Sequence, residues 1–199
     1  MITVETQARL DRLRRTLTDR DRSVVDAAPP LVRAGVLVPL IPSTNGVEIL
    51  LTRRTDTVLT HKGQISFPGG QQESGDADIV ETALREAYEE VGLEPSRVEV
   101  LGELDDVFTA VSGFVVTPVV GLLAGGTQDL RPAPTEVRSL LVVPITRLLE
   151  PAVHTTQVRT GNGQRFTIDY YTVDEDVIWG ATGRMLNQFL RAWEAAAEG

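Results

Sequence analysis

The composition of the chain excludes several classes of protein. It has 199 residues and no cysteine, and its 19 Lys and Arg residues stand against 28 Asp and Glu, which gives a formal net charge of −9. Without cysteine there is no disulfide framework, no cysteine-ligated zinc site and no thiol nucleophile, and the acidic balance argues against nucleic acid as a general partner because phosphate backbones are held by basic surfaces.

The first half of the chain predicts a helix followed by a hairpin. Leucines recur at helical spacing among Arg and Asp residues, which indicates an amphipathic helix over about 5–20. The segments 31–41 and 47–54 are apolar and are joined by the turn sequence STNG, which predicts two antiparallel strands. Residues 55–78 are too polar for a regular element and too long for a simple connection, and such loops are often functional.

A helix from about Asp78 to Val91 is the clearest prediction. Asp78 can cap its first turn, and Gly92 can end it in a left-handed conformation. Further along the chain we expect strands at 97–108, 114–124 and 137–143, a hairpin from 153–158 and 165–173, and a C-terminal helix at about 181–197. The pattern predicts an α/β fold with mixed strands and two or three helices.

Carboxylates gather on one side of the predicted helix. Glu86 and Glu90 lie one turn apart beside its apolar stripe, and Glu89 points farther out. Like charges at this spacing repel by about 0.2–0.5 kcal/mol per pair, and a hard divalent cation with oxygen ligands would compensate. Arg85 can neutralise or orient part of the cluster. The alternative is a solvated acidic helix face, which most Glu-rich helices are.

A glycine pair precedes this helix. Gly69 and Gly70 follow Phe67 and Pro68 and lie upstream of Arg85. A backbone turn of this kind can present a carbonyl oxygen to a metal and amides to phosphate. The glycine pair and the carboxylate helix together favour a metal and phosphate site over a merely solvated surface.

These residues resemble a known motif. Gly70, followed by 14 residues and then the sequence REAYEEVGL over 85–93, is similar to the Nudix box of hydrolases that cleave a nucleoside diphosphate linked to another group. The usual box has a glutamate six residues after its first glycine and the arginine eight residues after that. Here the spacing from glycine to arginine is one residue longer, and Asp76 stands six residues after Gly70, so its role stays open.

The upstream sequence resembles the extended motif of the coenzyme A pyrophosphatase branch, in which the one-residue insertion also occurs. The similar segments are LLTRR at 50–54 and HKGQISFPGG at 61–70. Thr55 stands where that motif usually has Ser or Ala, and Leu59 stands where it often has Arg. The resemblance implies a Nudix-like α/β/α sandwich with a central mixed sheet, formed by a single domain over 1–199 with its Nudix box at 70–93.

The resemblance also implies a reaction. It is hydrolysis of the pyrophosphate bond of coenzyme A or its derivatives, which gives 4′-phosphopantetheine or its acyl form and adenosine 3′,5′-bisphosphate. Pyrophosphate oxygens repel a nucleophile, so divalent cations, Mg²⁺ or Mn²⁺, are needed together with an oriented and deprotonated water. Two alternatives are a Nudix hydrolase of another nucleoside diphosphate derivative, such as ADP-ribose or a dinucleotide, and a non-catalytic nucleotide-binding module.

The site residues follow from the resemblance and the chemistry. The expected metal ligands are Glu86, Glu89, Glu90 and the Gly70 carbonyl. The expected catalytic residues are Arg85, Glu89 and Glu136. Glu136 lies in a loop before a strand and is the candidate general base, although a surface carboxylate at a strand start is an equal alternative. Weaker candidates for the base are Glu103, Asp105 and Asp106.

Basic residues near the motif are candidates for substrate binding. Arg53, Arg54 and Lys62 can contact substrate phosphates. At least one of the two arginines should point away, because neighbours in a strand face opposite sides. His61 is more often structural in such a loop than catalytic.

Location and partners follow from simpler observations. The first residues lack the apolar core of a signal peptide, and no apolar run approaches a membrane span. We therefore expect a cytoplasmic protein that binds a small coenzyme A-like nucleotide, with no nucleic acid or membrane partner, as a monomer or homodimer.

Overall fold

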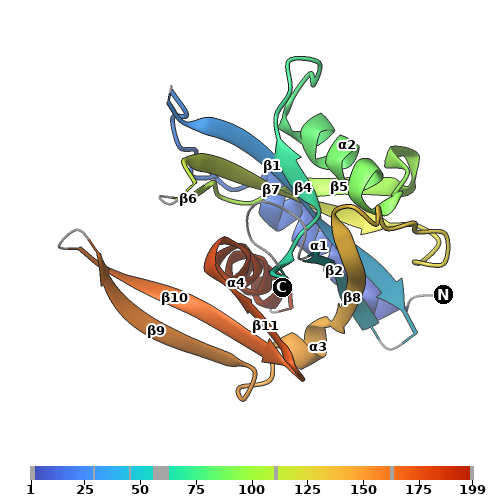
Figure 1. Ribbon diagram of the computed structural model, residues 1–199. Helices are drawn as coiled ribbons and strands as arrows, with labels where there is room; N and C mark the ends of the chain where they lie inside the picture. The colour runs from blue at the N-terminus through green and yellow to red at the C-terminus, as the bar shows by residue number, and fades with distance from the viewer. Residues whose placement is uncertain are drawn as a thin grey trace.

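The protein is described by a computed structural model that covers residues 3–28, 30–44, 46–55, 63–109, 112–161 and 164–197. The expected α/β class with a central mixed sheet is confirmed (Figure 1). The helices are α1 (Val4–Thr18), α2 (Ile79–Val91), the one-turn α3 (Ile145–Leu148) and α4 (Gly180–Ala195), with a 3₁₀ turn at Pro95–Arg97. Of these helices, the sequence analysis did not anticipate α3, which is too short to carry a periodic pattern.

Most strands fall where the apolar runs predict them. They are β1 (Val32–Ser43), β2 (Gly46–Arg54), β3 (Ile65–Ser66), β4 (Gly69–Gln71), β5 (Val98–Glu103), β6 (Val107–Thr109), β7 (Phe114–Leu123), β8 (Val137–Pro144), β9 (His154–Gly161), β10 (Gln164–Val173) and β11 (Asp176–Trp179). The expectation of an irregular segment over 55–78 is wrong in part, because β3 and β4 lie within it. Both are short and pair with distant strands, β2 and β1, so no local pattern marks them.

The central sheet has the strand order β3-β2-β1-β7-β5. Strand β4 also pairs with β1, β6 with β7 and β8 with β2. Strands β1 and β7 are parallel, and the other pairs in this sheet are antiparallel. A second sheet of β11-β10-β9 lies beside α4 (Figure 1).

Both faces of the central sheet are covered, which explains why β1 is apolar along most of its length. Val36, Val38 and Leu40 share one buried cluster with the apolar stripes of α1 and α4. Leu37 and Ile41 point the other way and share a second cluster with α2. This alternation is the period of two that a strand between two helical layers requires.

Side chains of α1 bind the carbonyls at the end of α4. Arg9 of α1 donates from Nη2 to the Trp193 carbonyl at 2.8 Å, and its guanidinium lies 4.2 Å from the centre of the Trp193 ring. Arg12 donates to the Ala196 carbonyl just beyond α4. Within the described ranges, no helix is both long and apolar enough to span a bilayer.

Candidate active site

Two glycines let α2 lie against the central sheet. A Cβ added to Gly35 of β1 would stand 2.6 Å from the Ile79 carbonyl at the start of α2. Gly35 pairs with Gly70 of β4, so the predicted glycine motif lies next to the same helix. Ala83 and Ala87 are buried on the inner face of α2, and their small side chains permit this approach. The close contact fixes where the carboxylates of α2 stand.

The start of α2 is held by a dense polar network around Asp76. Arg85 donates from Nε to Asp76 Oδ1 at 2.9 Å and from Nη2 to Oδ2 at 3.1 Å. The Thr82 hydroxyl and the Glu73 backbone N–H also donate to Oδ2 of this carboxylate. Hydrogen bonding to Arg85 is the main reason that the pKa of Asp76 lies far below its ordinary value. Sequence reasoning left the role of Asp76 open, and the structure makes it the anchor of Arg85.

Arg85 links this network to the metal-ligand candidates. Its Nη1 donates to Glu86 Oε1 at 2.9 Å and to Glu89 Oε2 at 3.1 Å, and its Nη2 donates to the Gln71 carbonyl. The pKa of Arg85 is raised, chiefly by the hydrogen bonds to Asp76. Arg85 therefore orients the carboxylates, as the sequence suggested.

Glu86 lies directly against the glycine turn. A Cβ added to Gly70 would come within 2.6 Å of the Glu86 carboxylate, so Gly70 makes room for it. The side chain of Glu86 is 16% exposed, and burial raises its pKa, while Arg85 acts in the opposite direction. Glu86 is thus a largely buried carboxylate beside the glycine turn.

Glu90 is the most buried acidic group on α2. Its side chain is 4% exposed, and Oε1 accepts a hydrogen bond from Arg54 Nη1 at 3.3 Å. Oε2 is buried and has no hydrogen-bond partner among the described residues. Burial raises the pKa of Glu90 to about 7. Arg54 and the Gly69 backbone lower it, and the charges of Glu136 and Glu86 raise it further. Glu90 is a carboxylate whose charge the protein only partly compensates.

The two remaining acidic candidates lie at the edge of the site. Glu89 is 56% exposed on its side chain and pairs only with Arg85 among the contacts described. Glu136 is exposed just before β8, and it lies near enough to Glu86 and Glu90 for its charge to raise the pKa of both. Its loop is fixed to α2 because the Ala133 N–H donates to the Glu90 carbonyl at 2.8 Å.

The residues at this site fit a hard divalent cation. No three His, Asp or Glu side chains within the described ranges converge into a ready metal cluster. Nevertheless, Glu90 Oε2 is a buried carboxylate oxygen without a donor, and the Glu86 carboxylate beside it rests against Gly70. Unpaired buried carboxylates are costly unless a cation is bound. Glu86 and Glu90 are the residues best placed to hold one.

The other predicted site residues are placed differently. Arg53 pairs with Asp176 of β11, on the opposite side of β2 from α2, so the two arginines reach different elements as strand alternation requires. Lys62 and His61 lie outside the described residues, as does Leu59. The weaker base candidates Glu103, Asp105 and Asp106 form ion pairs with Arg20 and Arg22 and hold the segment after α1.

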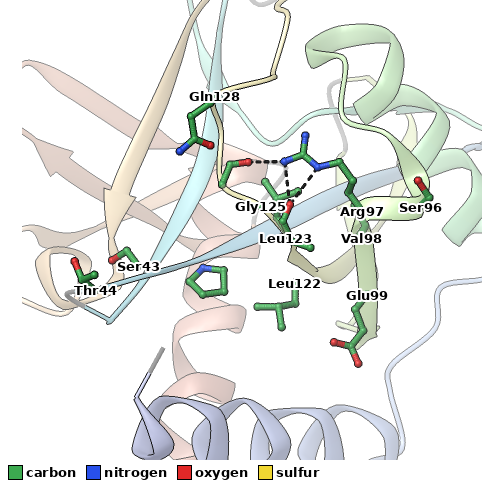
Figure 2. A pocket seen from close by; sticks show the side chains of 13 residues that line it. Ser43, Thr44, Ser96, Arg97, Val98, Glu99, Leu122, Leu123, Gly125 and Gln128 are labelled. Carbon is green, nitrogen blue, oxygen red and sulfur yellow. Dashed lines mark hydrogen bonds between the residues drawn. The ribbon is translucent and has the colours of Figure 1, made fainter. Parts of the chain in front are cut away.

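A cleft of about 640 Å³ lies at the other end of β1 (Figure 2). Ser43 and Thr44 line it, eight and nine residues along the chain from Gly35, or about 26–30 Å at the rise of a strand. Its charged side chains are engaged: Arg97 donates to the Ala124 and Gly126 carbonyls, and Glu99 pairs with Arg14. The cleft is therefore separate from the carboxylate site, and its charged side chains Arg97 and Glu99 are already paired within the protein.

The chain matches a known protein family over more than half of its length. Residues 31–160 match the family model described as NUDIX domain. The chain therefore belongs to the Nudix family, and it is an enzyme of the Nudix hydrolase class.

Relatives and solved structures with similarity to this chain carry the same class name or share its fold. A Photorhabdus laumondii protein named "Uncharacterized Nudix hydrolase NudL" is 37% identical over 155 residues, which cover 78% of this chain and 81% of the relative. The Pectobacterium atrosepticum protein of the same name is 40% identical over 162 residues, 78% of this chain and 80% of the relative. A solved structure of a C. elegans Ap4A hydrolase binary complex has a TM-score of 0.55 at 16% identity, covering 83% of this chain and 96% of that one, and this likeness shows the fold.

Proposed function

We propose that this enzyme hydrolyses the pyrophosphate bond of coenzyme A or a derivative with the aid of Mg²⁺ or Mn²⁺. The products are 4′-phosphopantetheine, or its acyl form, and adenosine 3′,5′-bisphosphate. The observation that carries the proposal is the joining of two motifs in one place. Arg54 of the upstream LLTRR sequence contacts Glu90 of the Nudix box, and Gly70 of the FPGG sequence lies beside Glu86.

Glu86 and Glu90, with Glu89 and the Gly70 carbonyl as further ligands, would hold the metal. When bound, the cation neutralises pyrophosphate oxygens and lowers the pKa of a bound water. Arg85 keeps Glu86 and Glu89 oriented through its hydrogen bonds. Arg54 is a donor for a substrate phosphate oxygen, and Lys62 is a weaker candidate for that role. The earlier candidate Arg53 is paired with Asp176 of β11 and is not proposed as a phosphate donor.

Glu136 is the proposed general base. It is exposed, so water reaches it, and it lies near enough to Glu86 and Glu90 for its charge to raise the pKa of both. A base must reach the attacking water within hydrogen-bond distance while remaining ionised. The hydrogen bond between the Ala133 N–H and the Glu90 carbonyl, which joins the loop of Glu136 to α2, supports this role.

A substrate panel tests the proposal. Purified full-length protein is incubated with coenzyme A, an acyl-coenzyme A, ADP-ribose and a dinucleoside polyphosphate, with Mg²⁺, with Mn²⁺ and with EDTA, and products are resolved by chromatography. Coenzyme A is expected to have the highest kcat/KM, and EDTA should abolish turnover. Preferential cleavage of ADP-ribose or a dinucleotide would overturn the substrate assignment but not the class of enzyme.

The second candidate function is hydrolysis of another nucleoside diphosphate derivative, such as ADP-ribose or a dinucleotide. Thr55 favours this alternative because the coenzyme A motif usually has Ser or Ala at that position. The Thr55 hydroxyl donates to the Thr135 carbonyl next to Glu136, so the departure lies near the site. The cytoplasm is the proposed location, and a monomer or a homodimer is the proposed state. A small nucleotide is the proposed partner in either case.

A further inference from the structure

Arg54 contacts Glu90, one of the two carboxylates proposed to hold the metal. Its Nη1 lies 3.3 Å from Glu90 Oε1, and the Glu90 side chain is almost completely buried. The guanidinium supplies the positive charge for this carboxylate within the described residues, because the other charges acting on Glu90, those of Glu86 and Glu136, are negative. The pairing is incomplete, since Oε2 has no donor.

The contact differs from a structural ion pair in the same molecule. Arg85 and Asp76 form two hydrogen bonds between guanidinium and carboxylate, the geometry that makes such pairs strong. Arg54 makes a single long hydrogen bond to Glu90. Arg54 also has a 24% exposed side chain, so its guanidinium can leave Glu90 without being stranded in an apolar interior.

Its neighbour Arg53 provides an internal comparison. Arg53 has the same charge and comes from the same end of β2, but it pairs with Asp176 of β11. The side chain of Asp176 is 12% exposed, and it belongs to the second sheet. The two adjacent arginines therefore perform different tasks: one joins the sheets, and the other faces the metal-ligand candidates.

We propose that Arg54 is an exchangeable counterion that occupies the cation position at Glu90 and is displaced when the divalent metal binds. The inference rests on the proposed metal dependence. A metal that takes Oε1 of Glu90, alone or together with the unpartnered Oε2, needs the position that Arg54 Nη1 holds, so this mode of metal binding and the Arg54–Glu90 contact exclude each other. Once displaced, the guanidinium lies beside the site without its carboxylate partner and is free to donate to a substrate phosphate. Arg54 thereby couples metal loading to the appearance of an anion-binding group.

Metal affinity without substrate tests this exchange. Mn²⁺ is titrated into the full-length wild type, R54Q and R53Q, and free Mn²⁺ is followed by electron paramagnetic resonance. R54Q is expected to bind Mn²⁺ more tightly by about threefold or more, because the competing ion pair is lost. R53Q is the matched control and should bind Mn²⁺ as the wild type does. Equal or weaker affinity in R54Q overturns the exchange.

A second measurement separates displacement from a general change in charge. The arginine Nε–H signal of Arg54 is assigned in a nitrogen-15 NMR spectrum by its loss in R54Q. Saturating Mg²⁺ should shift this signal, while the corresponding signal of Arg53, assigned with R53Q, stays in place. An unshifted Arg54 signal in Mg²⁺-bound protein overturns the proposal even if R54Q binds metal more tightly.

The charge-preserving R54K variant covers the case in which R54Q folds poorly. Lysine keeps the competing charge, so its Mn²⁺ affinity should lie near that of the wild type. An R54K affinity that exceeds the wild type by threefold or more would contradict competition by charge. If neither the wild type nor any of the variants binds Mn²⁺, the proposed metal dependence fails as well, an outcome distinct from metal binding that is unaffected by R54Q.

Discussion

Asp76, just before α2, and Glu90, near its end, both have nearly buried side chains and both contact an arginine, yet their environments differ. Asp76 accepts hydrogen bonds from Arg85, Thr82 and the Glu73 backbone. Glu90 accepts a long hydrogen bond from Arg54 and is also stabilised by the Gly69 backbone, but its buried Oε2 has no hydrogen-bond partner among the described residues. The pKa of Asp76 is lowered by its partners, and that of Glu90 is raised by burial to about 7.

The difference separates Asp76, whose hydrogen bonds are satisfied within the protein, from Glu90, the proposed metal ligand. A group that is fully hydrogen-bonded contributes to stability, whereas a buried charge left partly uncompensated is costly and tends to be found where a ligand binds. α2 therefore has a satisfied, rigid start and an incompletely satisfied end. Substitutions at the two ends should affect different properties.

The largest expected effect is on turnover in E90Q. The amide keeps the shape of the side chain and removes the charge that would hold a metal. A bound metal supplies several kcal/mol to the transition state, so kcat should fall by about 100-fold or more. Steady-state kinetics at saturating Mg²⁺ measure this. Unchanged kinetics would remove Glu90 from the metal site.

The raised pKa of Glu90 predicts how the free energy of unfolding depends on pH in the metal-free protein. The pKa of Glu90 is about 7 in the folded state against an ordinary value of 4.5, so the folded state binds more protons between these values. Glu90 therefore contributes fully to the free energy of unfolding below pH 4.5. This contribution, up to about 3 kcal/mol, is lost as the pH rises through 7.

Urea unfolding of the EDTA-treated protein at pH 5 and pH 8 measures that loss. E90Q, which has no titrating carboxyl group at this position, should lose less stability over the same interval. Asp76 behaves in the opposite way: its stabilising contribution is present above its ordinary pKa and declines as pH falls below it. Identical pH profiles for wild type and E90Q would contradict the uncompensated burial of Glu90.

At the other end of the helix, D76N should mainly affect stability. The amide loses the charge-assisted hydrogen bonds to Arg85, and we expect the free energy of unfolding to fall by about 2 kcal/mol. The control is E73Q, an exposed side chain in the same loop, which should change stability by less than about 0.5 kcal/mol. If D76N lowered kcat as much as E90Q without lowering stability, the distinction between the two ends would fail.

The smallest effect on stability is expected for E89Q. Its carboxylate is 56% exposed, and Arg85 keeps its stronger bonds to Asp76 without it. The unfolding free energy should stay within about 0.5 kcal/mol of the wild type. Turnover should fall by about tenfold, less than in E90Q, because Glu89 lies farther from the buried ligands. A fall in kcat as large as that of E90Q would place Glu89 among the principal metal ligands.

Local sequence patterns predicted the elements that carry the site. The α2 helix begins after Asp78, whose Oδ1 accepts the Glu81 N–H, and ends at Gly92 with a φ of 69°, as the capping pattern indicates. The 153–158 and 165–173 segments also form the expected hairpin, β9 and β10. These features depend on interactions between neighbours in the chain, so the sequence reveals them directly.

The pairing of charged side chains was not predictable in the same way. Alternation along β2 showed that Arg53 and Arg54 must diverge, but it did not say which of them meets the helix. Their partners are 123 and 36 residues away in the chain, and only the packing of the sheets and α2 brings each pair together. The role of Asp76 was not predictable for a related reason, because it depends on how the segment before α2 folds back onto Arg85, which lies nine residues farther along the chain.

By itself, the sequence determined the α/β class, the Nudix box and the residue types that can bind a divalent cation. It did so because helix caps, strand alternation and motif spacing are local. The tertiary structure decided which carboxylate is satisfied and which is not, because burial and the reach of each arginine depend on contacts between distant segments. These long-range contacts distinguish Asp76, which anchors Arg85, from Glu90, the proposed metal ligand.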